Sequence, residues 1–282
     1  MAKRAFLIGI NRYHIAGGDL RGCVNDVKDL SAALVKFHGF KNRDIAVLVD
    51  RAATKKAMLA GIKKLVRDSK KGDVAVLHYS GHGSNVPDDT RDETDRRDEI
   101  LCPTDLDWND PLRDDWLRST LDGVRGGVSV TVIMDCCHSG TNTRAILPPD
   151  APSKERYLPS PWGLAAVESG RSLPKRITGE LRRSRRAARK ANDIVNADLP
   201  EMLITGCRDT QTSADALING RYNGALTFAL VEAIHKSKGR LTYRELHDRA
   251  SRVLKARKFE QVPQLEGRTA GFDLPLFSAS RQ

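Results

Sequence analysis

Two short polar segments of this chain hold the side chains that are best suited to covalent chemistry. The first reads SGHG (residues 80–83), the second reads DCCHSG (135–140), and each follows an apolar run. A cysteine thiol becomes a strong nucleophile when a neighbouring base takes its proton, and a histidine can be that base. The backbone amides of Gly83 and Cys137 could stabilise the oxyanion of an acyl-transfer reaction. These residue types predict nucleophilic catalysis by Cys137 with His82 as its base.

Other interpretations of the same side chains stay open at this point. A histidine after a strand is more often a loop residue, and a buried cysteine often behaves as a small apolar residue. A metal ion could be bound jointly by His82, Cys136, Cys137 and His138. A phosphatase is excluded, because its arginine would stand six positions after the cysteine, where this chain has Thr143.

The segments around the two clusters alternate between strand-like and helix-like patterns. Runs rich in valine and isoleucine predict strands at Arg4–Ile10, Ile45–Val49, Val74–Tyr79, Val128–Met134, Met202–Cys207 and Val262–Leu265. Apolar residues at helical spacing predict helices at Asn25–Phe37, Lys55–Val66, Ala225–His235 and Tyr243–Leu254. This alternation predicts an α/β fold with a mostly parallel central sheet flanked by helices on both faces. Ligands bind such sheets at the carboxyl ends of the strands, where the two polar clusters are expected to meet.

Composition and cysteine usage limit the class of protein. The 282 residues are 40% hydrophobic and 29% charged, which is typical of a soluble globular protein. No apolar run approaches the roughly 20 residues of a membrane-spanning helix, and Ala5–Ile10 is too short for a signal-peptide core. We therefore expect a cytoplasmic protein with no membrane association. The five cysteines are odd in number and form no C-x-x-C pair, which favours free thiols over disulfides or a structural zinc site.

The net charge of +11 is unevenly distributed along the chain. Residues 171–190 hold nine Arg or Lys and one Glu (+8), whereas residues 88–115 hold twelve Asp or Glu and four Arg (−8). No aromatic residues alternate with the basic ones, so nucleic-acid binding is not favoured, although a basic arm stays an alternative. Residues 144–199, rich in proline and arginine, predict a linker between 1–143 and 200–282 of one domain.

The order of several motifs resembles that of the metacaspases, relatives of the caspases. HYSGHG and DCCHSGT are similar to the two catalytic signatures of that family, and their separation (137 − 82 = 55) is close to the roughly 50 residues of caspases. Four further segments resemble metacaspase segments in the same order: RAFLIGIN near the start, GCVNDVKDL (22–30), DEILCPTD (98–105) and ITGCRDTQTSADA (204–216). The resemblance covers nearly the whole chain except 144–199. It implies a caspase-like fold, with 1–143 matching the large subunit and 200–282 the small one.

The resemblance also implies an activity and a set of site residues. It makes the chain a cysteine endopeptidase that cleaves protein or peptide substrates after Arg or Lys, with His82 and Cys137 catalytic and Cys136 not. The substrate pocket is implied to contain Cys23, Asp26, Ser80 and Asp135. Carboxylates pair well with a guanidinium, which suits this preference. No third catalytic residue can be assigned.

The resemblance further implies calcium as a candidate cofactor, although the chemistry itself requires none. Asp98, Asp114 and Asp115 match acidic ligand positions, and carboxylate oxygens suit this ion. The acid expected shortly after the catalytic cysteine is missing, since residues 140–144 read GTNTR.

We also expect the protein to cleave itself between Lys175 and Lys190 and to be a monomer. The alternatives are a catalytically idle caspase-like binding module and nucleic-acid contact through the basic linker.

Overall fold

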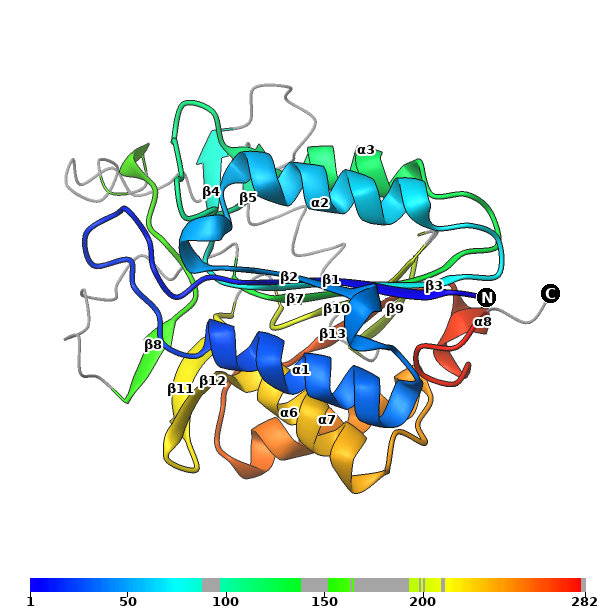
Figure 1. Cartoon of the computed structure of the whole chain (residues 1–282). Coiled ribbons are helices and arrows are strands. Elements are labelled where there is room, and N and C mark those ends of the chain that lie inside the picture. Colours follow the sequence, from blue (N-terminus) through cyan, green and yellow to red (C-terminus); the bar gives the residue numbers. More distant parts are fainter. Residues whose placement is uncertain are drawn as a thin grey trace, which may run out of the picture.

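A seven-stranded sheet forms the centre of the molecule in the order β2-β1-β3-β7-β10-β13-β9 (Figure 1). The computed structural model describes residues 1–87, 97–137, 152–162, 164, 193–197, 199, 201–208 and 211–279. The strands of the central sheet are β1 (Lys3–Gly9), β2 (Ile45–Val49), β3 (Val74–Ser80), β7 (Ser129–Asp135), β9 (Ile194–Asn196), β10 (Glu201–Thr205) and β13 (Gln264–Gly267). β2, β1, β3, β7 and β10 are mutually parallel, whereas β13 runs antiparallel to β10 and β9 runs parallel to β13. The predicted mostly parallel sheet is confirmed.

Helices cover both faces of this sheet (Figure 1). On one face lie α2 (Lys55–Asp68) and α3 (Asp114–Asp122), and on the other α1 (Cys23–His38), α6 (Ala225–Lys236) and α7 (Tyr243–Ala256). Short helical turns are η1 (Asn42–Asp44), η2 (Asp50–Ala52) and α8 (Thr269–Phe272). The predicted α/β class is therefore confirmed.

Strand β1 shows why the strand sequences are continuously apolar. Successive side chains of a strand point to opposite faces of the sheet. Ala5 and Leu7 pack into the buried cluster beneath α1, α6 and α7, whereas Phe6 and Ile8 pack into the cluster beneath α2. Because both faces are covered, the four central positions Ala5–Ile8 are all apolar, and the charged Lys3 and Arg4 stand at the less buried start of the strand.

Local capping determines where several helices begin and end. The Thr54 hydroxyl accepts a hydrogen bond from the Ala57 amide at the start of α2. At the start of α7, Thr242 and Glu245 form a reciprocal capping box. Helix α1 ends at Gly39, whose φ of 70° is the left-handed conformation that glycine adopts without strain.

Two small sheets at the carboxyl ends of the parallel strands were not predicted from the sequence. One contains β4 (Gly83–Pro87), β5 (Arg97–Leu101) and β6 (Leu112–Arg113), and the other contains β8 (Ser153–Glu155), β11 (Ala214–Ile218) and β12 (Arg221–Gly224). Both β8 and β9 belong to the segment 144–199, so parts of the expected linker are strands of the folded domain.

Two further features concern the chemical setting of the chain. Among the described residues, no helix combines the length and the apolar character that crossing a membrane requires. Each of the five cysteines carries a free thiol.

Candidate active site

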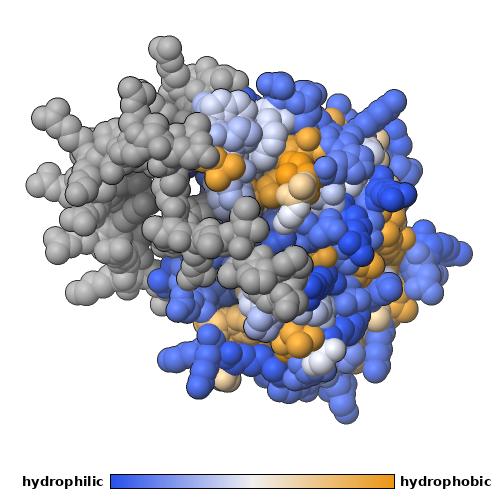
Figure 2. Space-filling view, turned by 90° about the vertical axis from the view of Figure 1, so that its left-hand side faces the viewer, coloured by the Kyte–Doolittle hydropathy of each residue, from blue (hydrophilic) through white to orange (hydrophobic). Residues whose placement is uncertain are grey.

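The two polar clusters leave adjacent parallel strands at the same edge of the sheet. β3 and β7 pair in a register that sets Ser80 beside Asp135. His82 and Cys137 each stand two residues beyond this pair, and both side chains are fully buried. Figure 2 looks onto this end of the molecule, where the described surface is mostly hydrophilic with a few apolar patches.

A backbone carbonyl fixes the orientation of His82. Its Nε2 lies 2.7 Å from the oxygen of Gly18, in the loop between β1 and α1. Because a carbonyl oxygen only accepts, Nε2 is the donor and Nδ1 keeps its lone pair. Within the described part of the chain, the buried Nδ1 has no hydrogen-bond partner. Burial lowers the pKa of His82 to about 3, so the ring is neutral and Nδ1 carries a lone pair.

The thiol of Cys137 contacts residues between β10 and β11. The Ser213 amide donates to Sγ, and Sγ lies 3.9 Å from the Sγ of Cys207. Burial is the main reason why the pKa of Cys137 is well above its ordinary value, so the thiol is protonated in this state. The preceding residue, Cys136, instead belongs to the apolar cluster beneath α2 and α3.

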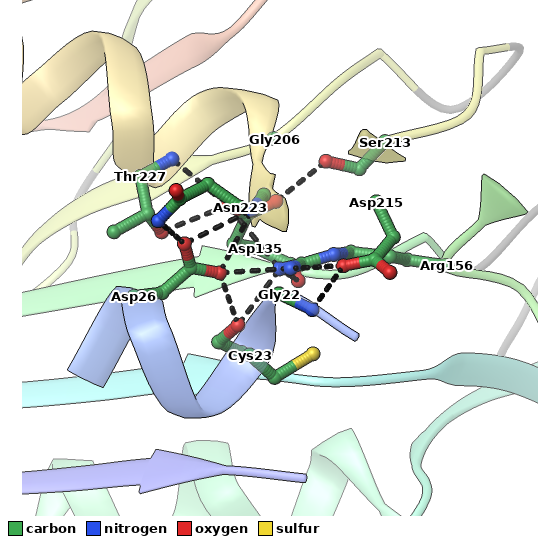
Figure 3. A network of polar contacts seen from close by, with 12 residues as sticks. Gly22, Cys23, Asp26, Asp135, Arg156, Gly206, Ser213, Asp215, Asn223 and Thr227 are labelled. Atoms are coloured by element: carbon green, nitrogen blue, oxygen red, sulfur yellow. Dashed lines mark hydrogen bonds and ion pairs between the residues drawn. The ribbon is translucent and has the colours of Figure 1, made fainter. Parts of the chain in front are cut away.

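A basic side chain of the protein itself occupies the pocket between β3, β7 and α1. Arg156, which follows β8, has no exposed surface. Its Nη2 lies 2.8 Å from Asp26 Oδ2 and 3.1 Å from Asp215 Oδ1 (Figure 3). Its Nη1 lies 2.8 Å from Ser80 Oγ and 3.3 Å from Asp135 Oδ2. The structure thus brings Asp26, Ser80 and Asp135 together and adds Asp215, which the sequence analysis did not identify.

Backbone and side-chain donors hold two of the three carboxylates in place. Asp26 accepts from the amide of Gly224 and the side chain of Asn223, and Asp135 accepts from the amide and hydroxyl of Thr227. These hydrogen bonds stabilise the negative charge of the two carboxylates in addition to the positive charge of Arg156. Burial nevertheless raises the pKa of Asp26 to about 7, against the opposing effect of the guanidinium.

The pocket wall is closely packed at Gly224 and at Cys23. A Cβ at Gly224 would lie 2.2 Å from Asp135 Oδ2 and 2.4 Å from Arg156 Nη1, so glycine is required here. Cys23, the first residue of α1, is buried beside this network (Figure 3). Its thiol stays protonated because burial raises its pKa well above the ordinary value.

The backbone around Arg156 lies as an extended peptide across the two clusters. Strand β8 pairs antiparallel with β11, and the Arg156 amide donates to the oxygen of Ser213 at 2.9 Å. The carbonyl oxygen of Arg156 accepts from the amides of Gly83 and Cys137, at 3.0 and 3.2 Å. The next bond, between Arg156 and Tyr157, therefore lies where two amides polarise its carbonyl and the Cys137 thiol is adjacent.

The described residues alone do not make the calcium site that the sequence suggested. Asp98 is buried and forms an ion pair with Arg113, whereas Asp115 is exposed at the start of α3. No group of three or more His, Cys, Asp or Glu side chains is placed to hold a metal ion in the described part of the chain. A calcium ion would have to compete with the Arg113 guanidinium for Asp98.

Several expectations fall on residues outside the described ranges. His138, and with it the suggested four-ligand metal site, cannot be placed. The same holds for residues 140–144 and for the basic run 171–190. Nucleic-acid contact and cleavage between Lys175 and Lys190 stay predictions.

Sequence reasoning missed three members of the site for different reasons. Gly18 contributes only a backbone carbonyl, which leaves no signature in the side chains. Asp215 lies in ITGCRDTQTSADA, one of the segments that carry the family resemblance, and an acidic residue in that segment could have indicated a further pocket carboxylate. Arg156 lies in the segment that was expected to be a linker.

Comparison with known proteins agrees with this geometry. Residues 3–145 match the family model described as metacaspase, peptidase C14 domain. The chain is 31% identical to Metacaspase-1 of Scheffersomyces stipitis, over 93% of this chain and 70% of that protein. It is 30% identical to Metacaspase-1 of Schizosaccharomyces pombe and 33% to that of Yarrowia lipolytica, over 93% of this chain and 66% and 61% of theirs. The crystal structure of protein GSU0716 from Geobacter sulfurreducens superposes with a TM-score of 0.66 at 27% identity, covering all of both chains. The chain belongs to the metacaspase family of cysteine peptidases.

Proposed function

We propose that this protein is an endopeptidase that cleaves after Arg or Lys, with Cys137 as nucleophile and His82 as general base. One observation carries the proposal. The Arg156 side chain is buried among Asp26, Asp135 and Asp215, while its carbonyl oxygen accepts hydrogen bonds from the Gly83 and Cys137 amides. A substrate held in the same way would present its peptide bond to the thiol.

The reaction follows from this arrangement. His82 Nδ1 takes the proton of the Cys137 thiol as sulfur attacks the carbonyl carbon. The oxyanion accepts hydrogen bonds from the two amides, of Gly83 and Cys137. The intermediate then collapses, the C–N bond breaks, and His82 gives its proton to the leaving amine. Water, deprotonated by His82, hydrolyses the thioester and frees the acid. The Gly18 carbonyl keeps the proton of the ring on Nε2 throughout, so that Nδ1 faces the reaction.

The charges of the pocket support selection for a basic side chain. Three carboxylates surround a space that is shielded from water, so an aspartate there would be repelled by like charges. The two terminal nitrogens of Arg156 contact different acceptors, Asp26 and Asp215 on one side and Ser80 and Asp135 on the other. A lysine carries one ammonium and cannot reach both sides, so arginine is expected to be the better substrate.

Fluorogenic peptides that differ only in the residue before the scissile bond test this function. We expect cleavage in the order Arg, then Lys, with none after Asp. Cys137→Ala should abolish turnover, and the matched variant Cys136→Ala should keep much of it because that thiol packs into the core. An inactive Cys136→Ala together with an active Cys137→Ala would show that the nucleophile is wrongly assigned.

Self-cleavage is part of the proposal, with Arg156–Tyr157 as the bond that is cut. The support is the position of this bond beside Cys137, whereas the sequence analysis expected cuts between Lys175 and Lys190. Incubated active protein should yield a fragment that begins at Tyr157, and Cys137→Ala should stay whole. N-terminal sequencing distinguishes the two locations, and an active enzyme that remains uncut would refute self-cleavage.

A further inference from the structure

A lysine two residues before Arg156 contacts a separate part of the active-site rim. Lys154 Nζ donates to the carbonyl oxygens of Gly17 at 2.5 Å and Asp19 at 2.7 Å. These carbonyls belong to the loop between β1 and α1. The Asp19 carboxylate adds a favourable charge interaction with the same ammonium. The ammonium thus donates to two carbonyl oxygens, and the Asp19 and Asp215 carboxylates favour its charge whereas Arg21 opposes it, so the contact suits a cationic donor.

Because of the geometry of β8, a substrate bound in the same way would make the same contact. Side chains alternate along an extended peptide, so residues 154 and 156 point to the same side of the strand. The antiparallel pairing of Lys154 with Asp215 fixes the register. A foreign peptide with its arginine in the same pocket would place its third residue, counted back from the scissile bond, at these two carbonyls.

The same loop also holds the base. Gly18 stands between Gly17 and Asp19, whose carbonyls accept from the lysine, and its own oxygen fixes His82 Nε2. Gly17 and Asp19 are exposed, whereas Gly18 is buried. A lysine bound across Gly17 and Asp19 fastens the loop on both sides of Gly18. Occupation of the lysine site is thereby linked to the orientation of the imidazole.

We infer that the Gly17 and Asp19 carbonyls form a subsite selecting Lys or Arg at the third position before the cleaved bond. The inference rests on the proposed function and specifies its substrate class as peptides of the form (Lys/Arg)-x-Arg. Because the loop also orients His82, a third-position lysine raises kcat as well as lowering KM. The subsite is partly exposed, so two charge-assisted hydrogen bonds there are worth about ten-fold in kcat/KM.

Three peptides tested on the full chain decide the matter. They share the sequence Ser-X-Glu-Arg before a fluorogenic amine, with X being lysine, norleucine or glutamate. Norleucine keeps the aliphatic stem and lacks the charge. We expect kcat/KM for lysine to exceed that for norleucine by about ten-fold, with kcat contributing, and glutamate to be the poorest.

Two variants separate the subsite from general effects. Asp19→Asn removes the charge near the lysine, so it should reduce the lysine-to-norleucine ratio, whereas the distant, partly exposed Asp68→Asn should leave it unchanged. In the chain's own segment, Lys154→Met should slow self-cleavage at Arg156–Tyr157, and the exposed Lys56→Met should not.

The outcomes distinguish a failure of the proposed subsite from a failure of the proposed peptidase function. If all three peptides are cut after Arg at rates within two-fold of one another, the subsite is refuted and the proposed function stands. If none is cut after Arg, the proposed function fails and the subsite fails with it.

Discussion

Arg156→Ala is expected to release residues 153–157 from the active site. The guanidinium is completely buried and forms ion pairs with Asp26, Asp135 and Asp215. Removing one partner of a buried ion pair costs about 3–5 kcal/mol, and the lower end applies because water can enter the vacated space. About 3 kcal/mol corresponds to a shift on the order of 100-fold toward the released state. The attachments that remain are the pairing of three residues of β8 with β11, the backbone hydrogen bonds of residue 156 and the Lys154 contacts.

Binding of a labelled peptide measures this release without any cleavage. In the Cys137→Ala background the chain stays whole, and its own segment competes with a fluorescent peptide of sequence APSKERYL, copied from residues 151–158. Adding Arg156→Ala should strengthen binding about 100-fold, as read by fluorescence anisotropy. The matched control is Arg244→Ala, an exposed arginine that pairs with Asp273. Equal affinities with and without Arg156 would refute the reasoning, because the segment would then not block the pocket.

Three further predictions concern the acidic residues. Burial raises the pKa of Asp26 to about 7, so this carboxylate takes up a proton as the pH falls below 7, and kcat/KM for an Arg peptide should fall over the same range. Asp26→Asn should lose at least ten-fold in kcat/KM at pH 8, and its kcat/KM should no longer show this decline at acidic pH. The same raised pKa means that Asp26 adds stability at low pH that is lost as the pH rises from about 4 through 7, so the decline in Tm over this range should be smaller in Asp26→Asn. If Asp98, Asp114 and Asp115 help to bind calcium, millimolar calcium should raise activity and Asp115→Ala should remove the response. Equal rates in calcium and in chelator would refute a calcium role.

The central sheet could be predicted because its strands are buried on both faces. Val74–Tyr79 and Val128–Met134 are apolar runs with few polar breaks, and in the structure each strand ends one residue later, at Ser80 and Asp135. The small sheets at the carboxyl ends could not be predicted in this way. β4 reads GSNVP and β12 reads RYNG, polar segments whose pairing depends on partners far away in the sequence.

The pocket was accessible to sequence reasoning only in part. Spacing alone gave no reason to bring Asp26, on α1, together with Asp135 at the end of β7, and the family resemblance supplied that link. The structure gives a physical reason for both carboxylates, because Asp26 is tied to Gly224 at the end of β12 and Asp135 to Thr227 in the first turn of α6. Arg156 was missed because the prolines around it predict irregular structure, whereas its position is set by pairing with β11.

That pairing also predicts the order of self-cleavage. Strand β11 has β12 on one side, and its other edge accepts either residues 153–155 or another extended peptide, as edge strands commonly do. While Arg156 fills the pocket, the basic residues between 175 and 190 have no access to it, however many they are. The fragment that begins at Tyr157 should therefore appear first, and fragments cut at 175–190 should follow only after a lag. In Arg156→Ala the first cut is lost, so the later ones should begin without the lag. A time course followed by mass spectrometry distinguishes the two orders, and early cuts at 175–190 in the unmodified chain would show that local density of arginine, not fit to the pocket, selects the bond.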